Sequence, residues 1–169
     1  MNLASFTLAS TLRLGFLLVS VPAAMLTYDH YQTEARFERT VARVMQAMEG
    51  QLSQTLADTG CLHVPANPTI AALEGANLLD RAIQAQSPWD LSIAYVSDAD
   101  TGLVMAKTLT LQAHSASAGE RLKSLVPLVV GSWRYDASTW SLNIHRGVRW
   151  PTYGVDQLEF NPQTACMAW

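Results

Sequence analysis

One triplet in the sequence matches the catalytic triplet of the aspartic proteases. It is Asp100-Thr101-Gly102, and those enzymes need two such aspartates to share a proton. The chain has a single copy, so a protease would have to build its site from two chains. The surrounding run, Asp98–Gly102, also has the composition of a turn between two strands. We therefore interpret the triplet as a turn and expect no catalytic residues.

The candidate metal ligands are also incomplete. Asp98 and Asp100 resemble the first positions of a calcium-binding loop, but the twelfth position is Leu109 instead of a glutamate. Cys61-Leu62-His63 holds two potential zinc ligands, and no second pair accompanies them. The other histidines are spread along the chain: His30, His114 and His145. We expect no metal ion and no cofactor.

Neither fingerprints nor charge indicates a nucleotide or a nucleic acid as ligand. The sequence has no nucleophile elbow, phosphate loop or dinucleotide fingerprint. Residues 29–169 carry all 14 acidic residues and 10 of the 11 basic ones, a net charge of −4, and the basic residues are dispersed. We expect a non-enzymatic protein that binds no nucleic acid.

The first 28 residues contain no Asp or Glu, and within them Leu14–Tyr28 is apolar apart from one Ser and one Thr. Extending this stretch back to Leu3 gives the roughly 20 residues that a membrane helix needs. Arg13 then stays on the cytoplasmic side. The alternative is a signal peptide cleaved after Val21-Pro22-Ala23. Both interpretations export residues 29–169.

The chain has two cysteines, Cys61 and Cys166, and an even number in an exported protein favours a disulfide. The bond would join the end of the first helical region to the end of the chain.

Four of the five tryptophans lie in the last third of the sequence: Trp133, Trp140, Trp150 and Trp169. We expect most of these to pack between strands, and Trp169 to contact a partner or cover the disulfide.

Residues 29–58 have the apolar period of one long helix. The stripe consists of Phe37, Val41, Val44, Met48, Leu52 and Leu56. Thr59-Gly60 is a plausible stop. A helix of roughly 30 residues is about 45 Å long, longer than a small domain is wide. We therefore expect Phe37, Val41 and Val44 to contact other subunits, and Phe37 and Val41 to protrude from the domain. The C-terminal part of the helix, Met48–Leu56, should pack on the protein's own strands.

The rest of the chain has the sequence patterns of short helices and β-hairpins. Thr69–Gln86 is predicted as a short amphipathic helix, and Leu91–Val96 and Leu103–Leu111 as a first hairpin. A capping box at Ser117–Glu120 predicts a helix over 118–125. A second hairpin is predicted from Trp133 to Ile144, with one or two short strands between Val148 and Phe160. The fold class is α+β, with a long N-terminal helix, its first part membrane-embedded, packed on a small antiparallel sheet.

This layout resembles the type IV pilins and the pseudopilins of type II secretion. Ser5-Phe6-Thr7-Leu8 is similar to that family's processing site, and a helix from Phe6 to Asp58 suits the family's spine. A Cys close to the C-terminus, paired upstream, also resembles these pilins. Ser10 stands where the family has a glutamate, so the resemblance implies a minor or atypical subunit.

The resemblance implies a non-enzymatic, membrane-anchored subunit of a bacterial pilus or secretion apparatus. We expect residues 1–28 to be an anchor in the inner membrane, 29–60 a helical stalk, and 61–169 an α+β domain in the periplasm or outside the cell. Its partners would be other subunits in a homo- or hetero-oligomer. Two alternatives stay open: a signal-cleaved, soluble periplasmic or secreted α+β binding module, and a bitopic scaffold protein of pilus or secretion assembly.

Overall fold

The computed structural model describes residues 3–66, 68–148, 159–161 and 164–168, with side chains described from Tyr28 onward except at 159, 160 and 168. The chain divides into two compact units, Met1–Phe37 and Glu38–Trp169. The helix α1 runs from Leu3 to Thr59 and supplies the regular structure of the first unit. It ends where predicted, because Gly60 takes a left-handed φ of +70° and its N–H donates to Leu56 O at 2.8 Å.

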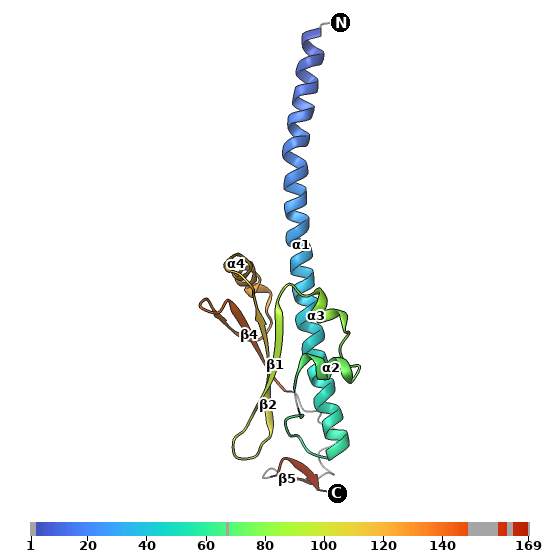
Figure 1. The fold of residues 1–169 in the computed structure, drawn as a ribbon, viewed down its shortest axis with the longest axis vertical. Helices are drawn as coiled ribbons and strands as arrows, with labels where there is room; N and C mark the ends of the chain where they lie inside the picture. The colour runs from blue at the N-terminus through green and yellow to red at the C-terminus, as the bar shows by residue number, and fades with distance from the viewer. Residues whose placement is uncertain (1–2, 67, 149–158, 162–163, 169) are drawn as a thin grey trace. The chain divides into compact units, whose positions relative to one another are not determined.

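The second unit contains the expected antiparallel sheet. Its strands are β1 (Asp90–Ser97), β2 (Val104–Gln112), β3 (Ser132–Asp136) and β4 (Ser141–Gly147), in the spatial order β1-β2-β4-β3 (Figure 1). Both predicted hairpins are present, and they join through the antiparallel pair β2–β4, with Leu109 opposite Ile144. A second sheet pairs β5 (Glu159–Asn161) with β6 (Cys166–Ala168). The α+β class is therefore confirmed.

One face of the four-stranded sheet packs on the Glu38–Thr59 part of α1. Tyr95 on β1 donates its hydroxyl hydrogen to Met48 O at 3.0 Å, and Lys107 on β2 donates to Met45 O at 3.0 Å. The apolar side chains of this face are buried: Leu91, Ile93, Leu109, Leu111, Leu142 and Ile144. The opposite face carries polar pairs, Thr108 with His145 and Thr110 with Asn143. The alternation predicted for the strands thus separates core from surface.

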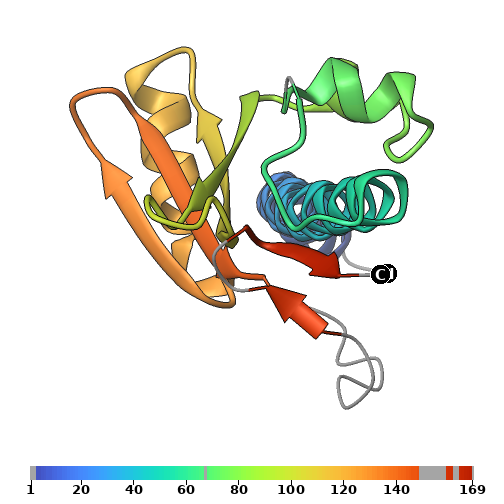
Figure 2. The same cartoon turned by 90° about the horizontal axis from the view of Figure 1, so that it is seen from below.

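Three shorter helices complete the second unit. The region 69–86, predicted as one helix, forms α2 (Ile70–Gly75) and α3 (Ala82–Gln86), since Asn77 takes a left-handed φ of 58° between them. Both lie along α1 on a different side from the sheet (Figures 1 and 2). The helix α4 runs from Ala116 to Ser124 and is followed by a 3₁₀ turn, η1 (Val126–Leu128).

The predicted start of α4 was wrong by two residues. Ser115, not Ser117, is the N-cap, and its hydroxyl accepts from Ala118 N. The stretch Val148–Phe160 was predicted to hold one or two strands, and β5 begins at Glu159. Residues 149–158 lie outside the described part of the chain.

Candidate functional site

The apolar stripe of α1 is buried from Phe37 onward. Phe37 is 1% exposed and Val41 5%, and Val44, Met48 and Leu52 are buried as well. The expected protrusion of Phe37 and Val41 is therefore wrong, because both side chains are buried and the covered part of the stripe begins about three helical turns before Met48, where it was expected to begin. A contact of Phe37, Val41 or Val44 with other subunits stays an untested prediction. The packing of Met48 and Leu52 inside the protein's own core is confirmed.

The exposed apolar side chains of α1 lie before this stripe. Tyr28 is 62% exposed and Tyr31 70% exposed, and all residues from Tyr28 to Arg36 are exposed or half-buried. The Tyr28 hydroxyl accepts a hydrogen bond from Gln32, four residues later on the same helix. Two aromatic rings three residues apart lie on one side of a helix. Their spacing was visible in the sequence, but only the burial of Phe37 shows where the covered face begins.

The tryptophans in the described part of the chain are divided between core and surface. Trp133 is 48% exposed and Trp140 36% exposed, while Trp89 is buried. Trp140 lies in the β3–β4 turn with a left-handed φ of 50°, outside the strand predicted for it. Trp150 and Trp169 lie outside the described residues, so the partner contact expected for Trp169 stays a prediction.

A buried lysine connects the sheet to α1. Lys107 is 1% exposed, and its ammonium group donates to Met45 O and to the carboxylate of Glu49. Burial lowers the pKa of Lys107 below its ordinary value, and the Glu49 carboxylate acts in the opposite direction. Burial likewise raises the pKa of Tyr95, whose hydroxyl reaches Met48 O and Gln51 Oε1. These polar groups fix the sheet against the helix.

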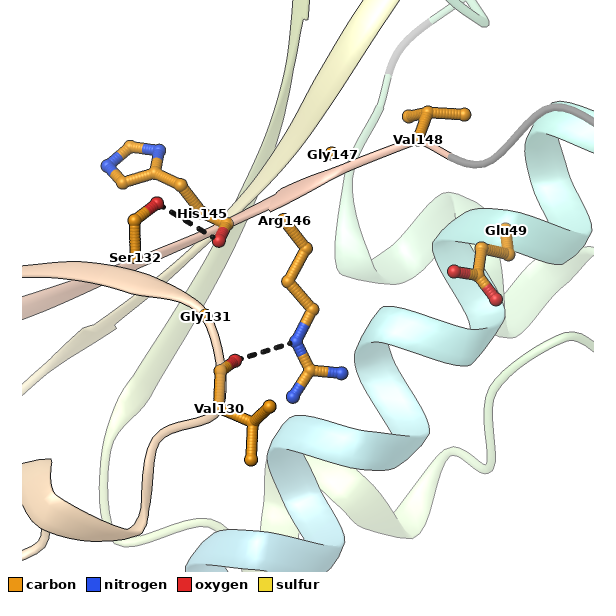
Figure 3. A pocket seen from close by; sticks show the side chains of 8 residues that line it. All are labelled: Glu49, Val130, Gly131, Ser132, His145, Arg146, Gly147 and Val148. Atoms are coloured by element: carbon orange, nitrogen blue, oxygen red, sulfur yellow. Dashed lines mark hydrogen bonds between the residues drawn. The ribbon is translucent and has the colours of Figure 1, made fainter.

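A recess of about 700 Å³ opens beside this ion pair (Figure 3). It is lined by Glu49 from α1, by the Val130–Ser132 segment, by the end of β4 from His145 to Gly147, and by Val148 directly after β4. The Nε–H of Arg146 donates to Val130 O at 3.2 Å, which holds the guanidinium group in the recess. The lining contains no nucleophile hydrogen-bonded to a base, which is the arrangement covalent catalysis needs. The described lining gives the recess the chemistry of a polar surface groove.

The Asp98–Gly102 cluster is a turn, as interpreted. The Asp98 carboxylate accepts from the N–H groups of Asp100 and Thr101 and from the Thr101 hydroxyl. These hydrogen bonds lower the pKa of Asp98. Gly102 has a φ of +72°, a conformation that favours glycine. The resemblance to a protease triplet is therefore explained by turn geometry.

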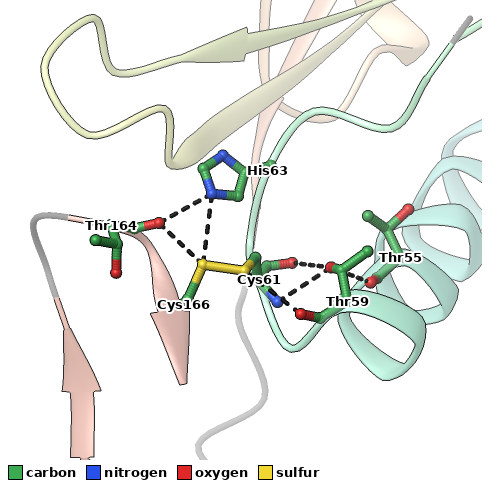
Figure 4. The surroundings of a disulfide bond; sticks show 6 residues. All are labelled: Thr55, Thr59, Cys61, His63, Thr164 and Cys166. Atoms are coloured by element: carbon green, nitrogen blue, oxygen red, sulfur yellow. Dashed lines mark hydrogen bonds between the residues drawn. A yellow bond between two sulfur atoms is a disulfide. The ribbon is translucent and has the colours of Figure 1, made fainter. Parts of the chain in front are cut away.

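The predicted disulfide is confirmed: Cys61 and Cys166 are bonded, with their Cα atoms 3.9 Å apart (Figure 4). The two cysteines face each other in an isolated antiparallel bridge between the end of α1 and β6. Backbone hydrogen bonds flank the bridge, from Leu62 N to Ala165 O at 2.7 Å and from Met167 N to Gly60 O at 2.8 Å. The bond closes a loop of 105 residues.

The disulfide also brings a histidine into a cluster that sequence analysis missed. His63 Nε2 lies 3.7 Å from Cys166 Sγ and, when it carries the ring proton, donates to Thr164 O at 2.9 Å (Figure 4). Among the described residues, Cys61, His63 and Cys166 place their three potential ligand atoms within 4.8 Å of one another. The sequence shows Cys61-Leu62-His63, but pairing Cys61 with Cys166 is needed to see the third member.

The remaining histidines are local surface groups. His30 pairs with Glu34 at 3.1 Å, His114 with Asp90 at 3.4 Å, and His145 Nδ1 lies 2.9 Å from Thr108 Oγ1.

No helix in the described part of the chain has a stretch both long and apolar enough to cross a membrane. The expected anchor rests on residues 1–28, and the side chains of residues 1–27 lie outside that described part.

Comparison with protein-family models, with curated proteins and with solved structures finds no match to this chain.

Proposed function

We propose that this protein is a non-enzymatic, membrane-anchored subunit of an exported assembly such as a pilus or secretion apparatus, held to its neighbours by the first half of α1. The proposal combines the acid-free, apolar N-terminus with a helix that continues from Leu3 to Thr59. A helix of this length is several times the average of globular proteins, which is about 11–12 residues. The resemblance of the layout to type IV pilins supplies the class of assembly.

The observation that carries the proposal is the change in exposure along α1. From Phe37 to Leu52 the apolar stripe is buried, whereas Tyr28 and Tyr31 are mostly exposed. Two exposed tyrosines directly after an apolar segment suit either a membrane interface or a neighbouring helix, because each ring is apolar and carries a polar hydroxyl. The partner surface is therefore assigned to the helix before Phe37, not to Phe37 and Val41 themselves.

Site-specific photo-crosslinking tests this assignment. A photoreactive amino acid replaces Tyr31 in the full chain, and the matched control carries the same amino acid at Trp133, an exposed aromatic position on β3. We expect crosslinked adducts with other subunits or a second copy at position 31, and several-fold fewer at position 133. Equal yields at the two positions, or none at position 31, would remove the support for a helix-mediated assembly.

The contact must also be separable from folding. Tyr31→Glu places a charge on an exposed side chain, so the melting temperature of residues 29–169 should stay within about 2 °C of the unsubstituted domain, in line with the small effects of most surface substitutions. The expected outcome is that the Tyr31→Glu variant no longer co-purifies with the partner captured by the crosslinker at position 31, while its folding stays intact. A large fall in melting temperature would show instead that Tyr31 is part of the domain's own packing.

A further inference from the structure

We propose that, when its disulfide is reduced, the chain binds one zinc ion through Cys61, His63 and Cys166. This inference does not rest on the proposed function. It starts from the cluster at the end of α1, where two sulfur atoms and one imidazole nitrogen lie within 4.8 Å of one another. Two thiolates and one imidazole are a known ligand set for zinc, with the fourth position open to water.

The distances in the cluster already approach those of a tetrahedral site. Zinc–sulfur bonds of about 2.3 Å and zinc–nitrogen bonds of about 2.0–2.1 Å put the ligand atoms of such a site roughly 3.5–3.8 Å apart. His63 Nε2 and Cys166 Sγ are 3.7 Å apart. Cys61 Sγ lies within 4.8 Å of the imidazole nitrogen. When the disulfide opens, the two sulfur atoms move from bonded contact to van der Waals distance.

The backbone that carries the ligands is held independently of the disulfide. Hydrogen bonds join Leu62 N to Ala165 O and Met167 N to Gly60 O on either side of the cysteine pair, and Val104 N donates to Leu62 O at 3.1 Å. Opening the S–S bond therefore leaves both cysteines facing each other. A site held by such bonds loses less conformational entropy on binding the metal.

The loop after β1 shapes the position of the histidine. A Cβ atom at position 102 would lie 3.1 Å from His63 Nδ1, so Gly102 leaves the space that the imidazole ring occupies. The ring points Nε2 toward Thr164 O and Cys166 Sγ. When zinc binds, the ring proton passes through solvent from Nε2 to Nδ1, and Nε2 exchanges its bond with Thr164 O for the metal.

A reductant of the dithiol class donates two electrons and two protons: the Cys61–Cys166 S–S bond breaks, two thiols form, and the reductant becomes a disulfide. Zinc then displaces the two thiol protons and binds two thiolates and a neutral imidazole. The site with bound Zn²⁺ is electrically neutral, whereas the oxidised chain offers no thiolate to the metal.

Cobalt titration of the full chain tests the proposal. The protein is reduced with a dithiol, freed of reductant without oxygen, and titrated with Co²⁺, whose thiolate complexes absorb in the near ultraviolet. We expect one Co²⁺ per reduced chain, displaced by Zn²⁺, and no such absorption from the oxidised chain or from Cys61→Ser/Cys166→Ser. His63→Ala should weaken binding tenfold or more, and the control His114→Ala should not change it.

Folding is followed in the same samples by near-ultraviolet circular dichroism. Zinc should raise the melting temperature of the reduced chain, or restore its folded spectrum if reduction unfolds it, and reduced His63→Ala should need at least tenfold more zinc for the same effect. The proposal is overturned if the reduced chain binds no more cobalt than the double serine variant. It is equally overturned if His63→Ala binds as tightly as the unsubstituted chain.

Discussion

Lys107 places an ammonium group in the layer between the sheet and α1. Its partners are Met45 O and the Glu49 carboxylate, and Glu49 itself keeps 58% of its side chain exposed. An ion pair of this kind gains electrostatic energy but loses the hydration of the lysine, so its net contribution to stability is small. Its effect is to fix one register of the strand on the helix, since the ammonium group reaches two acceptors one turn apart.

Replacing this lysine with an apolar side chain of similar length should be tolerated. We expect Lys107→Met to have a free energy of unfolding within about 1.5 kcal/mol of the original at neutral pH, as for other buried ion pairs replaced by apolar groups. Burial lowers the folded-state pKa of Lys107, so above that pKa the unfolded chain binds more protons than the folded one. The contribution of Lys107 to stability therefore rises with pH up to its unfolded value of 10.5.

Urea unfolding at several alkaline pH values measures this effect. The stability of Lys107→Met relative to the original chain should fall as the pH approaches 10.5, while the matched variant Lys123→Met, at a position 58% exposed, should show no such trend. A stability difference for Lys107→Met that does not change with pH would show that the buried ammonium group is not penalised by desolvation.

At the scale of the elements, α4 is tied to the β3–β4 hairpin through one glycine. Tyr135 donates its hydroxyl hydrogen to Gly119 O at 3.0 Å, and a Cβ atom at position 119 would lie 2.8 Å from Trp140 Cβ. Trp140 itself takes a left-handed φ of 50° in the turn. The close approach of helix and turn therefore depends on the missing side chain at position 119.

Gly119→Ala should destabilise the domain despite the better helix propensity of alanine. We expect a loss of about 1–3 kcal/mol, the range for overpacked sites. The control is Gly75→Ala at the end of α2, where no atom lies within 4 Å of the added Cβ and the effect should be neutral or slightly stabilising. Chemical denaturation of both variants gives the comparison, and equal stability of the two would contradict the close packing described for Gly119.

The elements were largely predictable from sequence because their signals are local. The alternation of apolar and polar residues predicted the strands β1 to β4. The apolar stripe, followed by Gly60, predicted the end of α1. Two errors were local: Asn77 divides 69–86 into two helices because it takes a left-handed backbone conformation, and Ser115 caps α4 in place of Ser117. The burial of Phe37 and Val41 depends on how far the rest of the fold extends along the helix. The apolar period of the helix shows which side chains share a face, but not how much of that face is covered.

At the scale of the whole molecule, long-range pairing decides the candidate sites. The even number of cysteines predicted the Cys61–Cys166 bond, but the resulting approach of His63 to Cys166 required the fold. The same bond ties the last strand to the end of α1. On the chain-entropy model a loop of this length stabilises the folded state by roughly 4–5 kcal/mol.

The proposal that this protein belongs to a membrane-bound assembly requires that its N-terminus is retained in the membrane. The measurement that tests this most directly is the intact mass of the native protein recovered after carbonate extraction of membranes. The account predicts that the protein stays in the membrane pellet, with a mass that corresponds either to the uncleaved chain or to a chain beginning at Phe6. A chain beginning at Ala24 and recovered wholly in the soluble fraction would contradict it.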